Sequence, residues 1–132
     1  MEILLNKPKV HRYFAYGTLK RNFYFHEKYL GGDKSNYKGK CIANPEFTLY
    51  TNGMPHLVRE MTDMPVKGEL YEIDEDVLKS LDELEGHPVA FKREIIEVVD
   101  QSGDTKLAWA YLAPKYFGGR TTSWRTNEWG NE

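Results

Sequence analysis

The sequence predicts an α+β fold in a single domain. Several short strand-like segments, each bounded by glycine, proline or polar turn residues, are combined with only two segments of helical character. A chain of 132 residues is long enough to bury a core and close a small cavity without disulfides. No repeat, low-complexity segment or change of composition divides the chain. We therefore expect residues 1–132 to form one domain.

The first expected strand is an aromatic run that begins near Arg12 and ends at Gly17. Glycine tolerates a tight turn, and such a turn can leave backbone N–H groups pointing outward at the end of the strand. Outward N–H groups are able to hold an anion. Many strands also end at a glycine for conformational reasons alone, so this feature needs a chemical partner elsewhere in the chain.

The next segment is expected to be a short helix. Asn22 is a suitable cap for a helix over residues 23–30, and Gly31 with Gly32 is expected to stop it. The turn at the end of the first strand would then lie close to a helix N-terminus. The polar residues 33–40 are expected to form a loop.

The middle of the chain is expected to contain three short strands. Two of them lie over residues 40–43 and 47–50, and a turn over residues 51–53 follows them. The third strand covers residues 66–73. It contains Gly68, and a glycine inside a strand often marks a bulge or the close approach of another group.

The clearest helix begins at Asp74 and runs to Leu84 or Glu85, where Gly86 and then Pro88 stop it. Acidic residues in its first turn favour this start. Beyond it, two strands over residues 95–99 and 107–112 are expected to form a hairpin through a polar loop.

The C-terminal tail, residues 114–132, is polar and contains glycine, so it is expected either to pack over a sheet edge or to be mobile. Its large apolar anchors are Trp124 and Trp129. These two side chains could form a lid over a pocket or simply fix the end of the chain.

One carboxylate lies on the wrong face of the long helix. A helical wheel places Glu85 within the apolar stripe formed by Val77, Leu78, Leu81 and Leu84. Burial and the negative end of the helix dipole would both raise the pKa of Glu85, as a proton shuttle near neutral pH requires. The alternative is that the helix end frays and Glu85 turns into water. Glu83 is expected on the solvent face and Asp82 near its boundary.

Composition argues against several classes of protein. The chain has 18 basic and 20 acidic residues, a net charge of -2, so no overall field attracts nucleic acid. Residues 1–9 do not have the pattern of a signal peptide, and no stretch approaches the roughly 20 apolar residues of a membrane helix. We therefore expect a soluble, cytoplasmic protein without a nucleic-acid partner.

Residues that often hold metals or act as nucleophiles give no pattern of that kind. Cys41 is the single cysteine, which excludes an intramolecular disulfide, and it is expected to be a small buried apolar residue. The four histidines lack a paired metal-ligand spacing and are expected to be exposed or hydrogen-bonded. No phosphate-binding loop of the GxxxxGK[ST] type is present. No metal or cofactor is expected.

Three motifs in order resemble the gamma-glutamylcyclotransferase-like family. They are YGTLKR over residues 16–21, the segment over residues 66–75 and LDELEGHP over residues 81–88. The YGTLK form most resembles the gamma-glutamylamine cyclotransferase and AIG2-like branch. The match in order and spacing runs from about residue 12 to residue 112, which is most of the chain.

The resemblance implies a small mixed β-barrel with flanking helices and a pocket between the YGTL turn and the glutamate-bearing helix. It also implies a reaction, the cyclisation of a gamma-glutamyl amine or amide to 5-oxoproline with release of a free amine. Glu85 would be the general acid/base. The residues implied as substrate-binding are Tyr16, Gly17, Thr18 and Leu19, with Met54 and Pro55 on a bordering loop.

The chain departs from the family at Phe91, where many relatives have a tyrosine. A substrate contact made by that hydroxyl would be missing here, which leaves the substrate more open than the reaction. Tyr111, on the last expected strand, could supply a pocket hydroxyl or could be ordinary sheet packing.

Other functions remain open at this point. The fold could serve as a catalytically silent module that binds small molecules, since a fold does not fix an activity. The gamma-glutamyl group could also be a protecting group that is removed from a biosynthetic intermediate. Aromatic residues mixed with Lys20, Arg21 and Lys28 suggest an RNA-binding surface as a further rival. Oligomeric state is not predicted.

Overall fold

The computed structural model describes residues 10–23, 25–51, 54–114 and 124–130. Within these ranges the chain forms strands and two helices in a mixed order. The elements are β1 (Val10–Ala15), α2 (His26–Leu30), β2 (Ser35–Ala43), β3 (Phe47–Thr51), β4 (Pro55–Arg59), β5 (Lys67–Asp74), α3 (Glu75–Glu85), β6 (Lys92–Asp100), β7 (Thr105–Leu112) and β8 (Trp124–Thr126).

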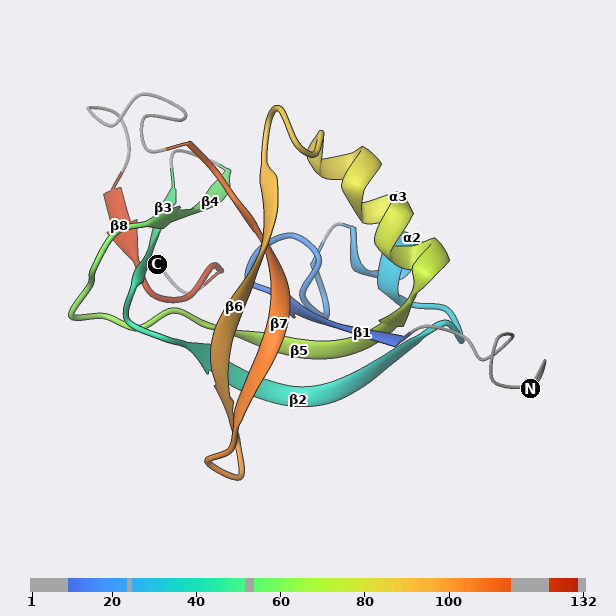
Figure 1. Ribbon diagram of the computed structural model, residues 1–132, viewed down its shortest axis with the longest axis horizontal. Coiled ribbons are helices and arrows are strands. Elements are labelled where there is room, and N and C mark those ends of the chain that lie inside the picture. Colours follow the sequence, from blue (N-terminus) through green and yellow to red (C-terminus); the bar gives the residue numbers. More distant parts are fainter. Residues whose placement is uncertain (1–9, 24, 52–53, 115–123, 131–132) are drawn as a thin grey trace, which may run out of the picture.

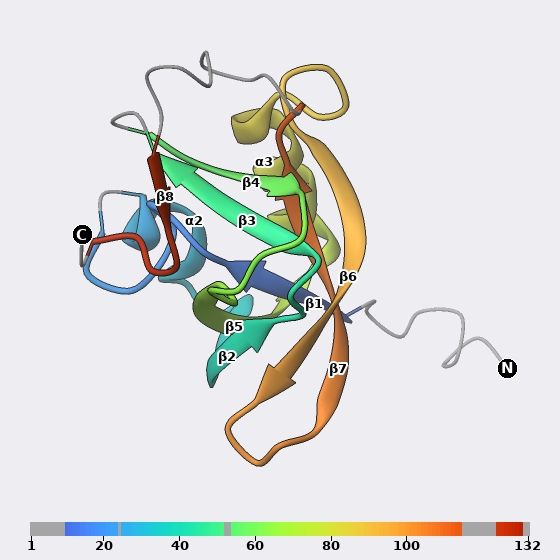
Figure 2. The same cartoon turned by 90° about the vertical axis from the view of Figure 1, so that its left-hand side faces the viewer.

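The strands form one sheet that closes into a small barrel. The hydrogen-bonded order is β1-β5-β2-β6-β7-β4-β3-β8, and a further pairing of β1 with β7 closes the first five strands on themselves. The pairs β1–β7 and β4–β7 are parallel, whereas the other pairs are antiparallel. Figures 1 and 2 show the barrel strands crossing one another at steep angles, and Figure 1 shows both helices on the same side of them. The predicted α+β class and mixed barrel are confirmed.

Gly68 allows the barrel to close tightly where β5 crosses β1. A Cβ atom at this position would lie 2.5 Å from the carbonyl oxygen of Ala15 and 2.5 Å from the ring of Phe14. Both contacts are shorter than any side chain tolerates, so only glycine fits. The predicted close approach at Gly68 is therefore confirmed, and β1, which leads into the YGTL turn, is held firmly against β5.

Helix α3 has the start, the end and the buried face that the sequence predicts. The Asp74 side chain accepts a hydrogen bond of 2.9 Å from the backbone N–H of Val77, which caps the first turn. Gly86 ends the helix in the left-handed conformation, with φ of 66°. Leu78 and Leu81 are buried between the helix and the barrel. Helix α3 therefore has a fixed end immediately after Glu85.

The first helix is shorter than predicted. It begins at His26, and Asn22 does not cap it but adopts a left-handed conformation with φ of 71°. Ahead of the helix, the N–H of Phe25 donates a 3.0 Å hydrogen bond to the carbonyl of Thr18. Asparagine tolerates positive φ, which explains why it suits this turn as well as it would suit a cap. Gly31 does end the helix.

Strands β4 and β8 and the first half of β2 were not predicted. Residues 35–40 belong to β2 and pair with β5, although a loop was expected there. This half of β2 pairs with β5, and its pairing with β6 covers only residues 41–43; side chains 36–38 are exposed, so the apolar alternation of a strand is absent. Strand β4 begins at Pro55, and proline at the first position of a strand reads equally well as part of a turn.

The end of the chain packs against a sheet edge. Strand β8 pairs with β3, and Trp129 packs on the barrel core. Lys20 donates a hydrogen bond of 2.8 Å from its ammonium group to the carbonyl of Trp129. Trp129 therefore fixes the described part of the tail, residues 124–130, to the barrel. The prediction that residues 1–9 are not a signal peptide concerns a segment outside the described residues.

Candidate active site

A cavity of about 280 Å³ lies between the turn after β1, the start of β4 and the C-terminal end of α3. All nine residues that the sequence singled out line it. They are Tyr16, Gly17, Thr18, Leu19, Met54, Pro55, Glu85, Phe91 and Tyr111. Segments that are far apart in the chain therefore meet in one pocket. The pocket has an open mouth, at which Met54 is 57% exposed.

Glu85 is the acidic residue that the pocket encloses most deeply. Its side chain is largely removed from water, and this burial raises the pKa of Glu85 to about 7 from an ordinary value of 4.5. No hydrogen bond or ion pair to its carboxylate is found in the described part of the chain. Glu85 thus lies in the pocket rather than turning outward, and near neutral pH it can both accept and return a proton.

The turn after β1 lines the same pocket and contains backbone N–H groups without a partner. The backbone N–H of Lys20 closes the turn by donating a 3.0 Å hydrogen bond to the carbonyl of Gly17. Within the residues that the structure covers, the N–H groups of Gly17, Thr18 and Leu19 have no acceptor. Three neighbouring N–H groups without partners are able to hold a carboxylate or a developing oxyanion.

Gly17 is required here by a close contact rather than by its backbone angles. A Cβ atom on Gly17 would lie 2.7 Å from Cγ of Pro55, which belongs to β4. The turn therefore packs directly against the start of the next wall of the pocket. This contact explains why Pro55 borders the turn although 38 residues separate it from Gly17 in the sequence.

The hydroxyl groups of two pocket tyrosines are already occupied. Tyr16 donates a 2.7 Å hydrogen bond to the backbone carbonyl of Tyr111. Tyr111 donates one of 2.8 Å to Asp82. The prediction that Tyr111 could supply a pocket hydroxyl is wrong in this structure, because its hydroxyl is directed at α3. Tyr111 still lines the pocket with its ring.

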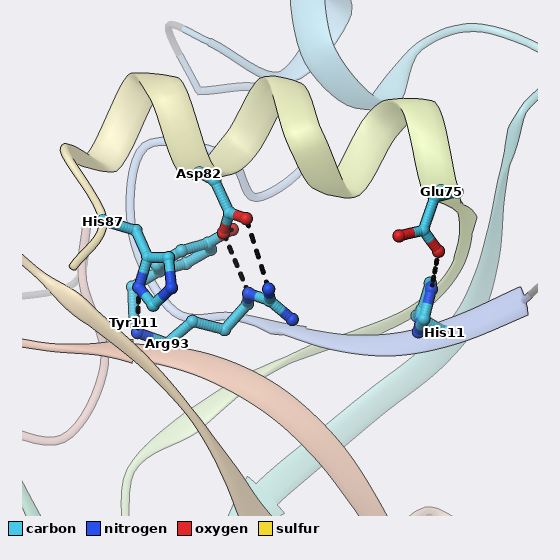
Figure 3. Close-up of polar contacts among 6 residues, drawn as sticks. All are labelled: His11, Glu75, Asp82, His87, Arg93 and Tyr111. Carbon is cyan, nitrogen blue, oxygen red and sulfur yellow. Dashed lines mark hydrogen bonds and ion pairs between the residues drawn. The ribbon is translucent and has the colours of Figure 1, made fainter.

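Asp82 ties the end of α3 to the barrel. The carboxylate accepts two hydrogen bonds from the Arg93 guanidinium, 2.9 Å from Nε and 3.2 Å from Nη2, besides the one from Tyr111. The backbone N–H of Arg93 donates to Nδ1 of His87 at 3.0 Å. Figure 3 shows these side chains converging beneath the helix from β6, β7 and the loop after α3. This network fixes the helical turn that carries Glu85.

The pocket also includes residues that the sequence did not indicate. They are Tyr13, Phe25, Glu83, Leu84, Gly86 and Ala90. Strand alternation places Tyr13 on the same face as Ala15, but the sequence alone does not reveal that this face meets α3. Phe25 and Ala90 belong to irregular segments and carry no comparable signal.

Histidine and cysteine take the structural roles that were expected. All four histidines make hydrogen bonds, His11 to Glu75 at 2.7 Å, His26 to Leu19, His56 to Met54 and His87 to Arg93. Cys41 is buried, and burial raises the pKa of its thiol to about 12. In the described ranges no group of three potential ligands could hold a metal ion, and no helix is long and apolar enough to cross a membrane.

Comparison with known proteins agrees with the fold and the motifs. The family model described as gamma-glutamyl cyclotransferase, AIG2-like, matches residues 13–131. A Methanocaldococcus jannaschii protein named "putative gamma-glutamylcyclotransferase" is 37% identical over 105 residues, which are 80% of this chain and 86% of that protein. The gamma-glutamylaminecyclotransferase of Rattus norvegicus is 34% identical over 64% of this chain and 61% of its own.

Two further relatives extend the comparison. The gamma-L-glutamyl-butirosin B gamma-glutamyl cyclotransferase of Niallia circulans is 32% identical over 85% of this chain and 74% of its own. The crystal structure of an AIG2-like protein from Mus musculus superposes with a TM-score of 0.79 at 25% identity, covering 90% of this chain and 87% of that one.

The chain belongs to the AIG2-like gamma-glutamyl cyclotransferase family. The family and the names of its relatives support gamma-glutamyl cyclotransferase activity in general. A pocket that contains a carboxyl group with a raised pKa and a turn with unpaired N–H groups is chemically suited to that class of reaction.

Proposed function

We propose that this protein cyclises a gamma-glutamylamine to 5-oxoproline and a free amine, with Glu85 as general acid and base. The observation that carries the proposal is a partly buried carboxyl group whose pKa is about 7 and which shares one pocket with the unpaired N–H groups of Gly17, Thr18 and Leu19. The same features weigh against a silent binding module, because binding alone does not require a proton-transferring group.

The reaction begins when the Glu85 carboxylate removes a proton from the substrate's α-ammonium group. The freed nitrogen lone pair attacks the γ-carbonyl carbon, a C–N bond forms, and the carbonyl π electrons move to oxygen. When the carbonyl re-forms, the original amide C–N bond breaks, and Glu85 returns the first proton to the leaving nitrogen. The attacking nitrogen loses a second proton as it becomes the lactam N–H, and this proton also passes through Glu85 to the released amine, which leaves as an ammonium ion. Attack within one molecule makes a covalent enzyme intermediate unnecessary.

The N–H groups of the turn after β1 take the negative charge in this scheme. They bind the substrate's α-carboxylate and so hold the glutamyl chain folded, with the amine near the γ-carbon. Fixing that conformation lowers the entropic contribution to the activation free energy of the cyclisation. Thr18, whose side chain is only partly buried, adds a hydroxyl to the same edge of the pocket.

The leaving group is proposed to be an amine without a carboxylate. Among the lining residues of the described chain, the charged ones are Glu83 and Glu85, both acidic. The remaining wall near the mouth is apolar and includes Met54, Pro55 and Phe91. A leaving group with a carboxylate, as in glutathione or a gamma-glutamyl amino acid, would meet negative charge without a compensating cation.

Removal of a gamma-glutamyl protecting group from a biosynthetic intermediate is the second candidate. It is favoured by the Niallia circulans relative, whose name gives butirosin B as the compound that carries the gamma-glutamyl group. That reaction uses the same chemical steps and differs only in the amine that leaves.

The test is the release of 5-oxoproline from a panel of gamma-glutamyl compounds. The panel contains ε-(gamma-glutamyl)-lysine, gamma-glutamyl-putrescine, gamma-glutamyl-alanine and glutathione. We expect turnover of gamma-glutamyl-putrescine, whose leaving amine carries no carboxylate, and much less of the other three compounds, whose leaving groups each carry one. The matched control is each active compound with its α-amine acetylated, which removes the nucleophile and must abolish release. Absence of release from every compound, or release from the acetylated ones, would contradict the proposal.

The pH dependence of turnover should report the Glu85 carboxyl group. Its ionised form is the base, and burial raises its pKa to about 7. kcat/KM should therefore fall as the pH drops below about 7, approaching a tenfold loss per pH unit. The measurement is kcat/KM between pH 5 and pH 9 in buffers of constant ionic strength. An acid limb near pH 4.5 would mean that the base is an ordinary exposed carboxylate.

A further inference from the structure

We propose that the Tyr13 hydroxyl is a catalytic hydrogen-bond donor, which binds the γ-carbonyl oxygen of the substrate and stabilises the negative charge that develops there. This inference rests on the proposed function, since it assigns a role within the same reaction. Tyr13 lines the pocket with Glu85 and with the turn after β1. Neither the sequence motifs nor the family resemblance pointed to it.

Elimination among the pocket tyrosines leads to Tyr13. The Tyr16 hydroxyl is bound to a backbone carbonyl, and the Tyr111 hydroxyl is bound to Asp82. Phe91 has no hydroxyl at all. In the described part of the structure the Tyr13 hydroxyl makes no hydrogen bond, so it is the tyrosine donor that the pocket keeps available for a ligand.

The Tyr13 hydroxyl is accessible although its side chain is only 3% exposed. The described chain contains two sealed side-chain polar atoms without a partner, Ser35 Oγ and Trp129 Nε1. The Tyr13 oxygen is not one of them. An oxygen without a protein partner that is not sealed must face open space, and the space beside Tyr13 is the pocket. A ligand that enters the pocket can therefore reach this hydroxyl and accept its hydrogen bond.

The ring of Tyr13 is held in place by its surroundings. It packs edge-on against the ring of Tyr111, with 6.0 Å between the ring centres. Its backbone lies where the barrel closes, opposite Trp109 of β7 on one side and Tyr71 of β5 on the other. A hydroxyl on such a support needs little reorganisation during a reaction, which is the property of an effective charge-stabilising donor.

Burial and charge keep the proton on this hydroxyl, so Tyr13 donates a hydrogen bond and does not transfer its proton. Burial, and then the negative charge of Glu85, raise the pKa of Tyr13 well above its usual value. The phenol therefore keeps its proton throughout the working pH range. Tyr13 and Glu85 line the same cavity, so a substrate on which Glu85 acts lies in the pocket that Tyr13 also borders.

The γ-carbon is the centre that both groups serve. Glu85 moves protons on the two nitrogens that are bonded to this carbon in turn, the attacking amine and the leaving amine. The carbonyl oxygen is the third group on the same carbon, and it gains the electron pair when the C–N bond forms. A neutral donor beside Glu85 meets this oxygen, whereas the N–H groups of Gly17, Thr18 and Leu19 bind the α-carboxylate.

The test is the variant Tyr13→Phe, which removes one oxygen atom and retains the ring. We expect kcat for 5-oxoproline release to fall by about 10²- to 10³-fold, as for loss of one oxyanion donor. KM should change little, because the hydrogen bond strengthens only as charge develops. The acid limb near pH 7 should remain, since Glu85 is intact. The matched control is Tyr37→Phe, which deletes a hydroxyl from a tyrosine outside the pocket.

The outcomes separate this inference from the proposed function. If wild-type protein releases 5-oxoproline and Tyr13→Phe retains its kcat within threefold, the Tyr13 role is wrong while the proposed function stands. An equal loss in Tyr37→Phe, or a loss confined to KM, would also overturn it. If wild-type protein turns over no gamma-glutamyl compound, both fail together. Equal melting temperatures of wild type and Tyr13→Phe exclude a merely structural effect.

Discussion

Glu85→Gln should lower 5-oxoproline release by about 10²- to 10⁴-fold, the usual contribution of a general acid/base. Glutamine keeps the shape of the side chain and its place in the pocket, but it can neither accept the α-ammonium proton nor protonate the leaving nitrogen. The measurement is kcat at pH 8 with the most active compound of the gamma-glutamyl panel. Binding of 5-oxoproline should persist, because the turn N–H groups are unaltered.

The stability of the same variant provides its control. The folded pKa of Glu85 is about 7 and lies above the ordinary value of 4.5, so the folded protein binds this proton more tightly than the unfolded chain. The stability that results is present below about pH 4.5 and is lost as the pH rises through 7. At pH 8, therefore, Glu85→Gln should melt at a temperature no lower than wild type. An inactive variant with a lower melting temperature would leave misfolding as the explanation.

Asp82→Ala should lower the free energy of unfolding by about 3 kcal/mol, because it leaves a partly buried guanidinium and a tyrosine hydroxyl without their shared acceptor. Arg93 and Tyr111 lose three hydrogen bonds in total. The helical turn that carries Glu85 also loses its anchor, so kcat should fall as well. The measurement is urea unfolding, in which the midpoint shifts and the slope is unchanged.

Asp76→Ala is the matched control on the same helix. Asp76 pairs with Lys34 at 3.1 Å, but the two side chains are 71% and 57% exposed. Exposed pairs contribute little to stability, so the loss should be much smaller than for Asp82, and turnover should be unaffected. Equal losses in the two variants would show that the Asp82 network has no special importance.

Much of α3 could be predicted because its signals are local. Asp74 and Gly86 are adjacent to the turns that they cap, and the apolar stripe has the period of a helix. The same wheel placed Glu85 among apolar neighbours, and the structure has it partly buried in the pocket. Burial raises the pKa of Glu85 as predicted, whereas the contribution of the helix dipole stays a prediction.

The missed elements depend on partners far away in the chain. Residues 35–40 form a strand only because β5 offers a pairing edge, and their own pattern is polar. Likewise, the sequence could not show that Asp82 would capture the hydroxyl of Tyr111 and leave Tyr13 as the available donor. The Asp82–Tyr111 contact and the free Tyr13 hydroxyl both depend on how α3 packs on the barrel, which the periodicity of the sequence does not encode.

The closure of the barrel has a consequence for the order of folding. β1 and β7 join at Tyr13 and Trp109, so the seam links positions that are 96 residues apart in the sequence. Contacts of such separation form late, since a long loop must first be closed. The pocket takes walls from both sides of this seam, Tyr13 from β1 and Tyr111 from β7. A nascent chain therefore has no site until β7 has been synthesised, and the ability to bind a ligand arises together with the last step of assembly.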